Sequence, residues 1–432
     1  MNTIRRRIHL VLAALALILT GAVANAQPVT VRVAVGAVAT EFELHRQALE
    51  IFMAENPDIR VELFETPGGG DRLGLYLQFF EARSPDMDVL QTDVIWPGII
   101  EEHLVDLMPY GGADVLDDHF AGAIENYMLD GRLLAIPYQM GAGMFWYRTD
   151  LLEEYGYAGP PQTWSEMEEM ATTIMEGERA AGNPDMWGFV FQGNAYEGLT
   201  TNALEWLVSV GAGQIIESDR SITVNNDAAV AMLETAAGWV GTISPVGVTG
   251  FVEGTSADVF LSGNAVFLRN WPFVYGAGQA EGSAIRDRFG VTVLPAGEGP
   301  SGRHASTLGG QSFAVSRYST NPEAAARVAL FLASMPAQKI RAVDGSFSGT
   351  LIALYEDPEV LAVNPFFDGL QDIFASAVGR PTTVTGSDYG EVSRMFWTAV
   401  HDVLTGRRDA ESALALLELE LEGLTGFPTG QP

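Results

Sequence analysis

A succession of strand, helix, strand, helix and strand near the start of the chain constrains the fold most strongly. Residues 29–35 alternate between apolar and polar side chains as a strand does, and apolar residues then recur at helical spacing until Asn56-Pro57. Alternation returns in 59–63, followed by a predicted helix over about 71–82 and a short strand over 88–92. Strands that alternate with helices in this way form a parallel sheet, so the sequence predicts the α/β fold class.

The loops that follow the three predicted strands are the first candidates for a functional site. In open α/β sheets, ligands lie in the crevice beyond the carboxyl ends of the strands. The loops at that edge span 36–43, 66–72 and 92–98. We therefore expect a ligand of this sheet to lie near these loops.

Composition excludes several classes of protein. The chain has 432 residues, of which 47% are hydrophobic, so it is long enough for two or three domains and too apolar to be intrinsically disordered. The formal net charge of -31 repels phosphate backbones, which argues against a nucleic-acid partner. The absence of cysteine excludes disulfides, thiolate chemistry and a lipidated N-terminal cysteine. Lys339 is the only lysine, which leaves little room for P-loop or Schiff-base chemistry.

The N-terminal segment predicts export from the cytoplasm. Arg5-Arg6-Arg7 precede an apolar run over 10–20, and Ala24-Asn25-Ala26 provides the small-x-small pattern that a signal peptidase requires. The alternative, a membrane anchor, needs about 20 apolar residues, and this run is shorter. We therefore predict a signal peptide over 1–26 and a mature protein that is soluble and periplasmic, without a lipid anchor.

The rest of the chain predicts a second α/β region and a helical C-terminal third. Thr163 followed by Glu166 forms a candidate capping box at the start of a helix. The segment 290–295 reads as an isolated strand closed by proline, after which we expect the chain to return to the first region. Strong amphipathic helices are predicted over 321–335 and 410–424.

Signatures of catalysis and of metal binding are missing from the sequence. There is no G-x-S-x-G or H-E-x-x-H motif, and no G-x-G-x-x-G opens a helix after a strand. The segment 345–349 is only superficially similar to a nucleophile elbow, because its central residue is Phe347. The histidines after the signal segment lack metal-ligand spacing; they are His45, His103, His119, His304 and His401. We predict neither a metal nor a cofactor, but the carboxylates of a glycosidase leave no short motif and stay an open alternative.

Short segments that carry a family likeness run through the mature chain. They are 33–36 (VAVG) with Glu41, 91–98 (QTDVIWPG), 136–137 (IP), 146–152 (WYRTDLL), 160–164 (PPQTW), 187–193 (WGFVFQG), 196–199 (YEGL), 267–272 (FLRNWP), 307–310 (TLGG) and 379–381 (GRP). Through them the chain resembles the family 1 extracellular solute-binding proteins of ABC sugar importers, and among these the trehalose/maltose-binding type.

The resemblance implies a two-lobe periplasmic binding protein of type II-like architecture. Each lobe would be a sheet flanked by helices, with the ligand in the cleft between the lobes and closure by hinge bending. The expected division is a signal peptide over 1–26, lobe 1 over 27–138 plus 298–345, lobe 2 over 143–292 plus 347–426, and hinge crossings at 139–142, 293–297 and about 346. Such a protein is a monomer that binds a small glycoside, catalyses no reaction and docks on a membrane permease.

The resemblance also assigns roles to particular residues. Glu41, Arg72, Asp93 and Arg380 would hold sugar hydroxyls by charge-assisted hydrogen bonds, Trp271 would stack on a sugar ring, and the backbone of Gly309 and Gly310 would lie close to the ligand. Each residue also has a structural alternative. The two acids could favour a helix start or cap a turn, Arg72 could be a solvated helix residue, and Trp271 could be core. The glycines could make a turn, and Arg380 could pair with a carboxylate of a lobe.

Four positions depart from the trehalose/maltose pattern. Gln139 and Gly141 stand where such relatives place an aromatic and an acidic residue, Gln311 stands where a tryptophan is expected, and Phe273 lacks a hydroxyl. The pocket would therefore lose stacking area and one negative charge while it gains amides. These changes favour a glycoside with a small polar or anionic aglycone over trehalose or maltose.

The sequence thus predicts a periplasmic binding protein that takes an α-glucoside or related small glycoside to an ABC importer. Two alternatives stay open. One is an exported glycoside hydrolase or lyase that uses Glu41 and Asp93 as its acid and base. The other is a sugar-sensing module that presents its closed form to a membrane receptor.

Overall fold

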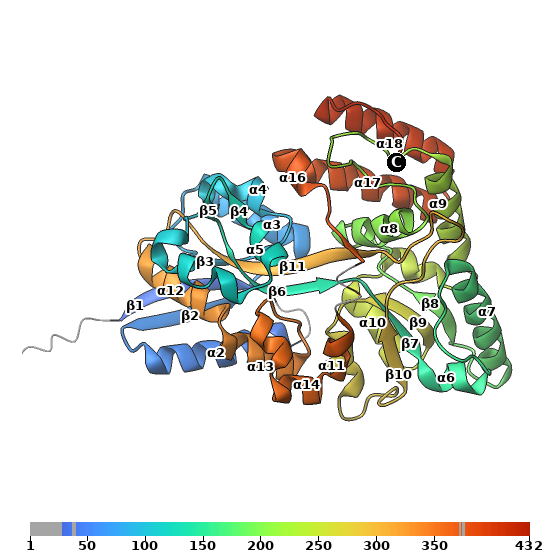
Figure 1. The fold of residues 1–432 in the computed structure, drawn as a ribbon, viewed down its shortest axis with the longest axis horizontal. Coiled ribbons are helices and arrows are strands. Elements are labelled where there is room, and N and C mark those ends of the chain that lie inside the picture. Colours follow the sequence, from blue (N-terminus) through green and yellow to red (C-terminus); the bar gives the residue numbers. More distant parts are fainter. Residues whose placement is uncertain (1–27, 37–39, 371–372, 374–375) are drawn as a thin grey trace, which may run out of the picture.

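The computed structural model describes residues 28–36, 40–370, 373 and 376–432, and the signal peptide predicted over 1–26 lies outside them. Two sheets, each flanked by helices, form two lobes that lie side by side (Figure 1). This arrangement confirms the predicted two-lobe α/β architecture.

The first lobe is built on the strand–helix succession at the start of the chain. Its strands are β1 (Val29–Val35), β2 (Ile59–Glu65), β3 (Val89–Asp93), β6 (Ile136–Ala142), β11 (Ser306–Val315) and β12 (Ala377–Val378). They follow the order β12-β11-β3-β1-β2, and β6 also pairs with β11. β1 is parallel to β2 and β3, and helices α2 (Glu41–Glu55) and α3 (Gly69–Glu81) connect these three strands. The predicted parallel succession is therefore confirmed.

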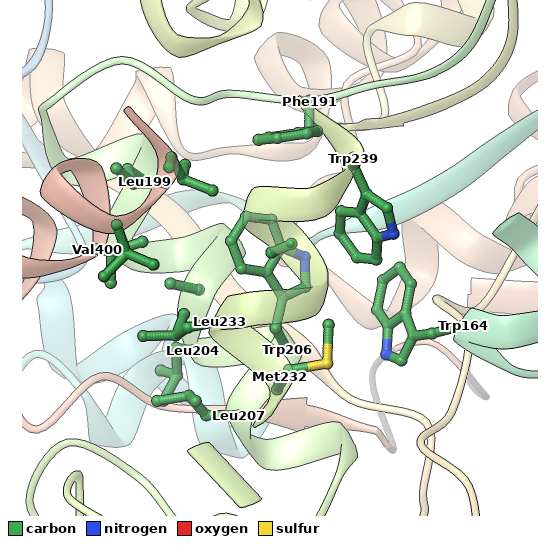
Figure 2. Packing of buried hydrophobic residues seen from close by; sticks show 14 of the residues in the cluster. Trp164, Phe191, Leu199, Leu204, Trp206, Leu207, Met232, Leu233, Trp239 and Val400 are labelled. Carbon is green, nitrogen blue, oxygen red and sulfur yellow. The ribbon is translucent and has the colours of Figure 1, made fainter. Parts of the chain in front are cut away.

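The second lobe packs helices around a smaller sheet and an aromatic core. Its strands are β7 (Met144–Arg148), β8 (Trp187–Val190), β9 (Ala265–Asn270) and β10 (Phe289–Thr292), in the order β10-β7-β9-β8. The longer helices are α7 (Trp164–Ala180), α8 (Glu197–Ser209), α9 (Asp227–Trp239), α17 (Tyr389–Leu404) and α18 (Ala410–Thr425). Figure 2 shows the core, where the ring of Trp239 lies 5.5 Å from that of Trp164 and 5.7 Å from that of Trp206. This aromatic core packs the helices of the second lobe together.

Shorter elements complete the two lobes. The helices are α4 (Pro97–Ile100), α5 (Ala121–Glu125), α6 (Thr149–Glu154), α10 (Glu253–Leu261), α11 (Val274–Gln279), α12 (Pro322–Leu332), α13 (Met335–Gly345), α14 (Pro358–Val363) and α16 (Thr382–Thr385). The single-turn 3-10 helices are η1 (Glu101–His103), η2 (Met108–Tyr110), η3 (Gly112–Asp114), η4 (Leu116–Asp118), η5 (Val246–Gly250), η6 (Ile352–Glu356), η7 (Pro365–Gly369) and η8 (Gly386–Asp388). A two-stranded hairpin joins β4 (Met128–Leu129) to β5 (Arg132–Leu133).

Several helix boundaries follow local signals in the sequence. Oγ1 of Thr163 accepts a hydrogen bond from the backbone N of Glu166 at 3.3 Å, which confirms the predicted cap of α7. The helix predicted over 321–335 is shorter than expected, because α12 ends at Leu332 and a proline in the first turn starts α13 separately. The helix predicted over 410–424 is confirmed as α18.

Two antiparallel strands run between the lobes as a ribbon (Figure 1). Gly309 of β11 lies opposite Gly141 of β6, and Gln311 lies opposite Gln139. The first predicted crossing, 139–142, therefore forms one side of this ribbon. Near the third predicted crossing, α13 ends and Ser346 adopts the left-handed conformation with φ 55°.

The second predicted crossing, 293–297, packs against the second lobe. The backbone N of Ala296 donates to the carbonyl of Gln162 at 2.8 Å, and the N of Gly297 donates to the carbonyl of Ser209 at 3.0 Å. The strand before this segment, β10, stays in the second sheet because it pairs with β7. The next strand of the first sheet is β11, which begins at Ser306.

The lobes also touch each other away from the ribbon. Helix α4 of the first lobe packs against η8 of the second, where Gly98 and Gly386 lie close together. In the described part of the chain, no helix combines the length and the apolar character needed to cross a membrane.

Candidate ligand-binding site

The ribbon between the lobes gathers several residues that the sequence analysis singled out. Gln311 lies opposite Gln139 on one side and opposite Asp93 on the other, because β11 is sandwiched between β6 and β3. Gly309 and Gly141 form a neighbouring rung of the same ladder. Residues separated by more than 200 positions in the sequence thus meet where the lobes join.

The indole ring of Trp271 lies directly on this ribbon. A Cβ atom added to Gly309 would lie 2.9 Å from the ring, so only glycine allows the ring to approach the strand this closely. The guanidinium of Arg269 lies 4.3 Å from the centre of the same ring, within the range of a cation–π contact. Trp271 as a whole is half-buried.

A buried ion pair holds the guanidinium that contacts the ring of Trp271. Arg269 and Glu205 are both fully buried, and Nε of Arg269 donates to Oε2 of Glu205 at 2.8 Å. Oε1 of Glu205 also accepts from the backbone N of Thr307 at 2.9 Å, at the start of β11. Burial raises the pKa of Glu205, and the charge and hydrogen bonds of Arg269 oppose that rise. The pair therefore connects the tryptophan to the ribbon.

Arg380 links carboxylates of both lobes. Its Nη1 donates to Oε1 of Glu197 in the second lobe at 2.8 Å, and its Nη2 lies 3.7 Å from Oδ1 of Asp93 in the first. Nη2 also donates to the carbonyl of Leu308 at 3.2 Å. Burial raises the pKa of the Asp93 carboxyl, and Arg380 opposes this effect. The structural alternative for Arg380, pairing with a carboxylate of a lobe, is thus realised at the junction of the two lobes.

Glu41 is buried in a polar network at the carboxyl end of the first sheet. Its Oε1 accepts from Nε2 of Gln91 at 2.5 Å and lies 3.0 Å from the hydroxyl oxygen of Tyr138. Burial alone would raise the pKa of Glu41, but the His45 imidazole, with Nε2 3.8 Å from Oε1, and smaller contributions from Arg72 and Tyr138 hold it below its usual range. Glu41 therefore carries a negative charge at neutral pH.

Arg72 and Gln311 belong to the same network. Arg72 donates to Oε1 of Gln91 at 3.0 Å and to the carbonyl of Pro67 at 3.0 Å, and only 4% of its surface is exposed. It is thus not the solvated helix residue considered as an alternative. Oε1 of Gln311 accepts from Nε2 of Gln91 and lies 2.6 Å from the hydroxyl oxygen of Tyr138, whose one proton is donated either to Gln311 or to Glu41.

Three residues singled out from the sequence retain buried polar atoms without a partner among the described residues. These atoms are Oε2 of Glu41, Oε1 of Gln139 and Nε of Arg380. Buried polar groups in proteins are nearly always hydrogen-bonded, so each such atom requires an explanation. A bound molecule with several hydroxyl groups would satisfy donors and acceptors of this kind.

The structure places the remaining predicted binding residues in different surroundings. Phe273 packs in an apolar cluster with Leu44 and Phe347, so it belongs to the core between the lobes. Gln139, Gly309 and Gly310 line a cavity of about 580 Å³, a size typical of small-molecule pockets. The other walls of this cavity include four aromatic residues, Phe120, Tyr127, Tyr355 and Phe367. None of Glu41, Arg72, Asp93, Trp271 and Arg380 lines it.

Sequence reasoning missed five residues that organise the site: Gln91, Tyr138, Glu197, Glu205 and Arg269. Three of them lie inside segments that carried the family likeness, namely 91–98, 196–199 and 267–272. Their partners are distant in the sequence, so no local pattern marks them as members of a network. Among the described residues, no group of histidine and carboxylate side chains is arranged to hold a metal ion.

Comparison with known proteins gives consistent similarities over most of the chain. The sequence profile of bacterial extracellular solute-binding proteins matches residues 36–339. A protein of Deinococcus radiodurans described as a probable ABC transporter-binding protein is 43% identical over 406 residues, which are 94% of this chain and 96% of that protein.

Solved structures agree in fold. Maltose-bound MalE3 of T. maritima superposes with a TM-score of 0.87 at 34% identity, covering 92% of this chain and 100% of that chain. The GacH receptor of Streptomyces glaucescens, solved without ligand and with acarbose, superposes with a TM-score of 0.82 at 20% identity over 93% of this chain and 100% of its own. The second likeness supports the fold alone.

Proposed function

Because the chain belongs to the bacterial extracellular solute-binding proteins, we propose that it is the periplasmic binding protein of an ABC sugar importer and takes an α-glucoside or related small glycoside to the membrane permease. The similarity to maltose-bound MalE3 supports a sugar as the solute. The members of this family bind solutes and are not enzymes, and we propose that this protein likewise releases its sugar unchanged. The export signal predicted over 1–26 supports the periplasmic location, and we expect a monomer.

One observation carries the proposal. The ring of Trp271 is half-buried on the β6–β11 ribbon, and Glu41, Gln139 and Arg380 keep buried polar atoms without partners among the described residues. A pyranose offers an apolar C–H face to an aromatic ring and hydroxyl groups to carboxylates, amides and guanidinium groups. A sugar would therefore satisfy both kinds of surface at once.

We propose that the lobes close on the sugar by bending at three segments. They are 139–142 on β6, the facing residues 308–311 on β11, and the chain near Ser346. The β6–β11 ribbon supports this placement because it runs between the two sheets. Arg380 would favour the closed form, since it contacts Glu197 of the second lobe and Asp93 of the first.

The four positions that depart from the trehalose/maltose pattern indicate which kind of sugar the protein binds. Gln139, Gly141 and Gln311 replace stacking area and one negative charge with amides, and Phe273 is buried. We propose that the second unit of the ligand is a small polar or anionic group in place of a second glucose. Arg72 and Arg380 would provide the positive charge for such a group.

Thermal unfolding of the mature protein against a panel of glycosides tests the proposal. The panel contains maltose, trehalose, methyl α-glucoside, α-glucosyl glycerol and α-glucosyl glycerate. A ligand that binds only the folded state raises the melting temperature, so we expect a shift with one or two members and recovery of the sugar unchanged. No shift with any member contradicts the proposed ligand class, and a cleaved sugar supports a glycoside hydrolase instead.

A further inference from the structure

One buried side chain of the first lobe joins three of the residues expected to bind the sugar. Gln91 lies on β3 with none of its surface exposed. Its Nε2 donates to Oε1 of Glu41 at 2.5 Å and to Oε1 of Gln311, and its Oε1 accepts from Nη1 of Arg72 at 3.0 Å. Oε1 also accepts from the backbone N of Gly36 at the end of β1. Three separate segments of the chain, around residues 36–41, 72 and 311, therefore meet at one amide.

We propose that Gln91 is a positioning residue of the binding site. It holds Glu41, Arg72 and Gln311 in the arrangement that binds the sugar, and it makes no contact with the sugar itself. The inference rests on the function proposed above. It assigns a role to a residue that neither the loops of the sheet nor the roles implied by the resemblance single out.

The chemistry of the amide explains why glutamine suits this position. An amide carries donors on one side and an acceptor on the other, and its two sides here face groups of opposite kind. The carboxylate of Glu41 and the carbonyl oxygen of Gln311 require a donor, whereas Arg72 requires an acceptor. A carboxylate in place of the amide would offer no donor to Glu41, and a leucine or methionine side chain would satisfy neither side.

Fixing Glu41 through one oxygen determines where its other oxygen lies. Oε1 of Glu41 is occupied by Gln91 and Tyr138, while Oε2 has no partner among the described residues. Arg72 is held in the same way, between Gln91 and the carbonyl of Pro67. Groups held in place before binding lose less entropy when the sugar arrives, so the network contributes to affinity without touching the ligand.

Charged and titratable groups face Gln91 and its partners from every element packed around them. Helix α2 contributes Glu41 and His45, α3 contributes Arg72, and β6 contributes Tyr138. Helix α13 contributes Arg341, whose guanidinium donates to Nδ1 of His45 at 3.2 Å and lies 4.2 Å from the centre of the Tyr138 ring. The side chain facing Glu41 must therefore be neutral, since a second carboxylate would lie against the first.

The substitution Gln91→Glu tests the role of the donor at nearly constant volume. Above the pKa of the introduced carboxyl, the donor is lost and a negative charge faces Glu41, so we expect the affinity for the glycoside to fall about tenfold or more at about pH 8. When that carboxyl is protonated it donates again, so we expect most of the affinity to return at about pH 5. The affinity of the wild type should change much less over the same range.

Two further variants separate positioning from a general loss of structure. Gln91→Met keeps the length of the side chain but cannot donate or titrate, so its affinity should fall at every pH without recovery. Gln338→Glu is the matched control, because Gln338 is also a buried amide that accepts from the backbone N of Thr350 at 2.7 Å and donates to Oγ1 of Thr350 at 3.0 Å, outside this network. It should lower the melting temperature while the affinity stays close to that of the wild type.

Calorimetric titration of each folded variant uses the panel glycoside that raises the melting temperature of the wild type most. A loss of affinity in Gln91→Glu that reverses at low pH, with Gln338→Glu unaffected, supports the inference. Equal affinity of the wild type and Gln91→Glu at about pH 8 overturns it and leaves the proposed function intact. If the wild type binds no glycoside of the panel, the proposed function fails and the positioning role fails with it.

Discussion

In the first lobe, Glu41 uses one carboxylate oxygen in its network and leaves the other without a partner among the described residues, whereas in the second lobe both oxygens of Glu205 accept hydrogen bonds. Each nitrogen of the Arg269 guanidinium also donates, Nε and Nη2 to Glu205 and Nη1 to Oε1 of Gln192. Both charged groups lie at the junction of the lobes. They differ in how much hydrogen-bonding capacity is left for a ligand.

This difference indicates that the two lobes provide different kinds of surface to a ligand. The saturated pair of the second lobe fixes an apolar surface, the ring of Trp271, against the crossing strand. The network of the first lobe contains a polar atom, Oε2 of Glu41, that has no partner among the described residues and could accept a hydrogen bond from a hydroxyl group. A buried ion pair whose atoms are already hydrogen-bonded forms few new bonds with a ligand. Buried polar atoms without partners form new hydrogen bonds when a ligand arrives.

The largest expected effect comes from breaking the saturated pair. Arg269→Met leaves the buried carboxylate of Glu205 without its partner, so the free energy of unfolding should fall by about 3–5 kcal/mol. Denaturant unfolding measures the loss. The double variant Arg269→Met with Glu205→Leu removes both charges and should recover much of the stability. A double variant that is less stable than Arg269→Met would contradict this account of the pair.

Acid should weaken the first lobe through His119. Burial lowers the pKa of His119 to about 4, and its Nδ1 lies 2.7 Å from Oγ1 of Thr350. Between about pH 6.5 and the folded-state pKa, the unfolded chain takes up a proton that the folded protein does not. The free energy of unfolding should therefore fall by about 3 kcal/mol as the pH drops through this window.

The variant His119→Asn isolates this contribution. Asparagine places a polar atom near the position of Nδ1 but does not titrate, so the variant should lose less stability than the wild type over the same pH window. Unfolding in denaturant at several pH values gives the comparison. Identical acid dependence in the two proteins would show that His119 does not contribute.

The substitution Trp271→Ala tests whether the ring of Trp271 in the second lobe stacks on the sugar. Loss of stacking and of buried apolar area should weaken glycoside binding by about 2–3 kcal/mol while the fold persists. Trp187→Ala is the matched control, because Trp187 is also half-buried in the second lobe and stacks on a guanidinium, with Arg179 4.5 Å from its ring centre. Titration calorimetry should show a loss only for Trp271→Ala, and equal losses in both would count against a role in the site.

The smallest effect on affinity is expected when the carboxylate of Glu41 is replaced. Glu41→Gln keeps the shape of the side chain and removes its charge, so the affinity should fall by roughly 1.5 kcal/mol, the difference that a charged acceptor makes to a hydrogen bond. The measurement is a titration with the same glycoside. Unchanged affinity would mean that Oε2 of Glu41 does not meet a sugar hydroxyl.

The sequence predicts what depends on local pattern or on ordered family segments. Alternation and helical spacing over 29–92 predict the parallel strands of the first lobe, and the likeness places Asp93, Gln139, Gly141, Gly309 and Gln311 in one site, where the ladder of β3, β11 and β6 brings them together. The segment 290–295 looks isolated in sequence because its partner strand β7 lies about 140 residues earlier.

Side-chain networks are less predictable, since their members come from distant segments. Nothing near Gln91 in the sequence shows that it will meet Glu41, Arg72 and Gln311, and nothing near Arg380 shows that Glu197 will bind it. The position of Phe273 after Trp271 predicts a ligand contact, but the turn that follows β9 directs its side chain into the core. Only the packing of the whole chain decides these contacts.

Closure of the lobes around a glycoside is the central claim, and a distance between the lobes tests it most directly. The chain contains no cysteine, so Glu102→Cys and Ser387→Cys would carry spin labels at two exposed positions and nowhere else. Glu102 lies in η1, directly after α4, and Ser387 lies in η8, which faces α4. Pulsed electron spin resonance should give a longer or broader distance without ligand and a single short distance with the bound glycoside. A distance distribution that does not change while calorimetry shows the sugar bound would contradict the account.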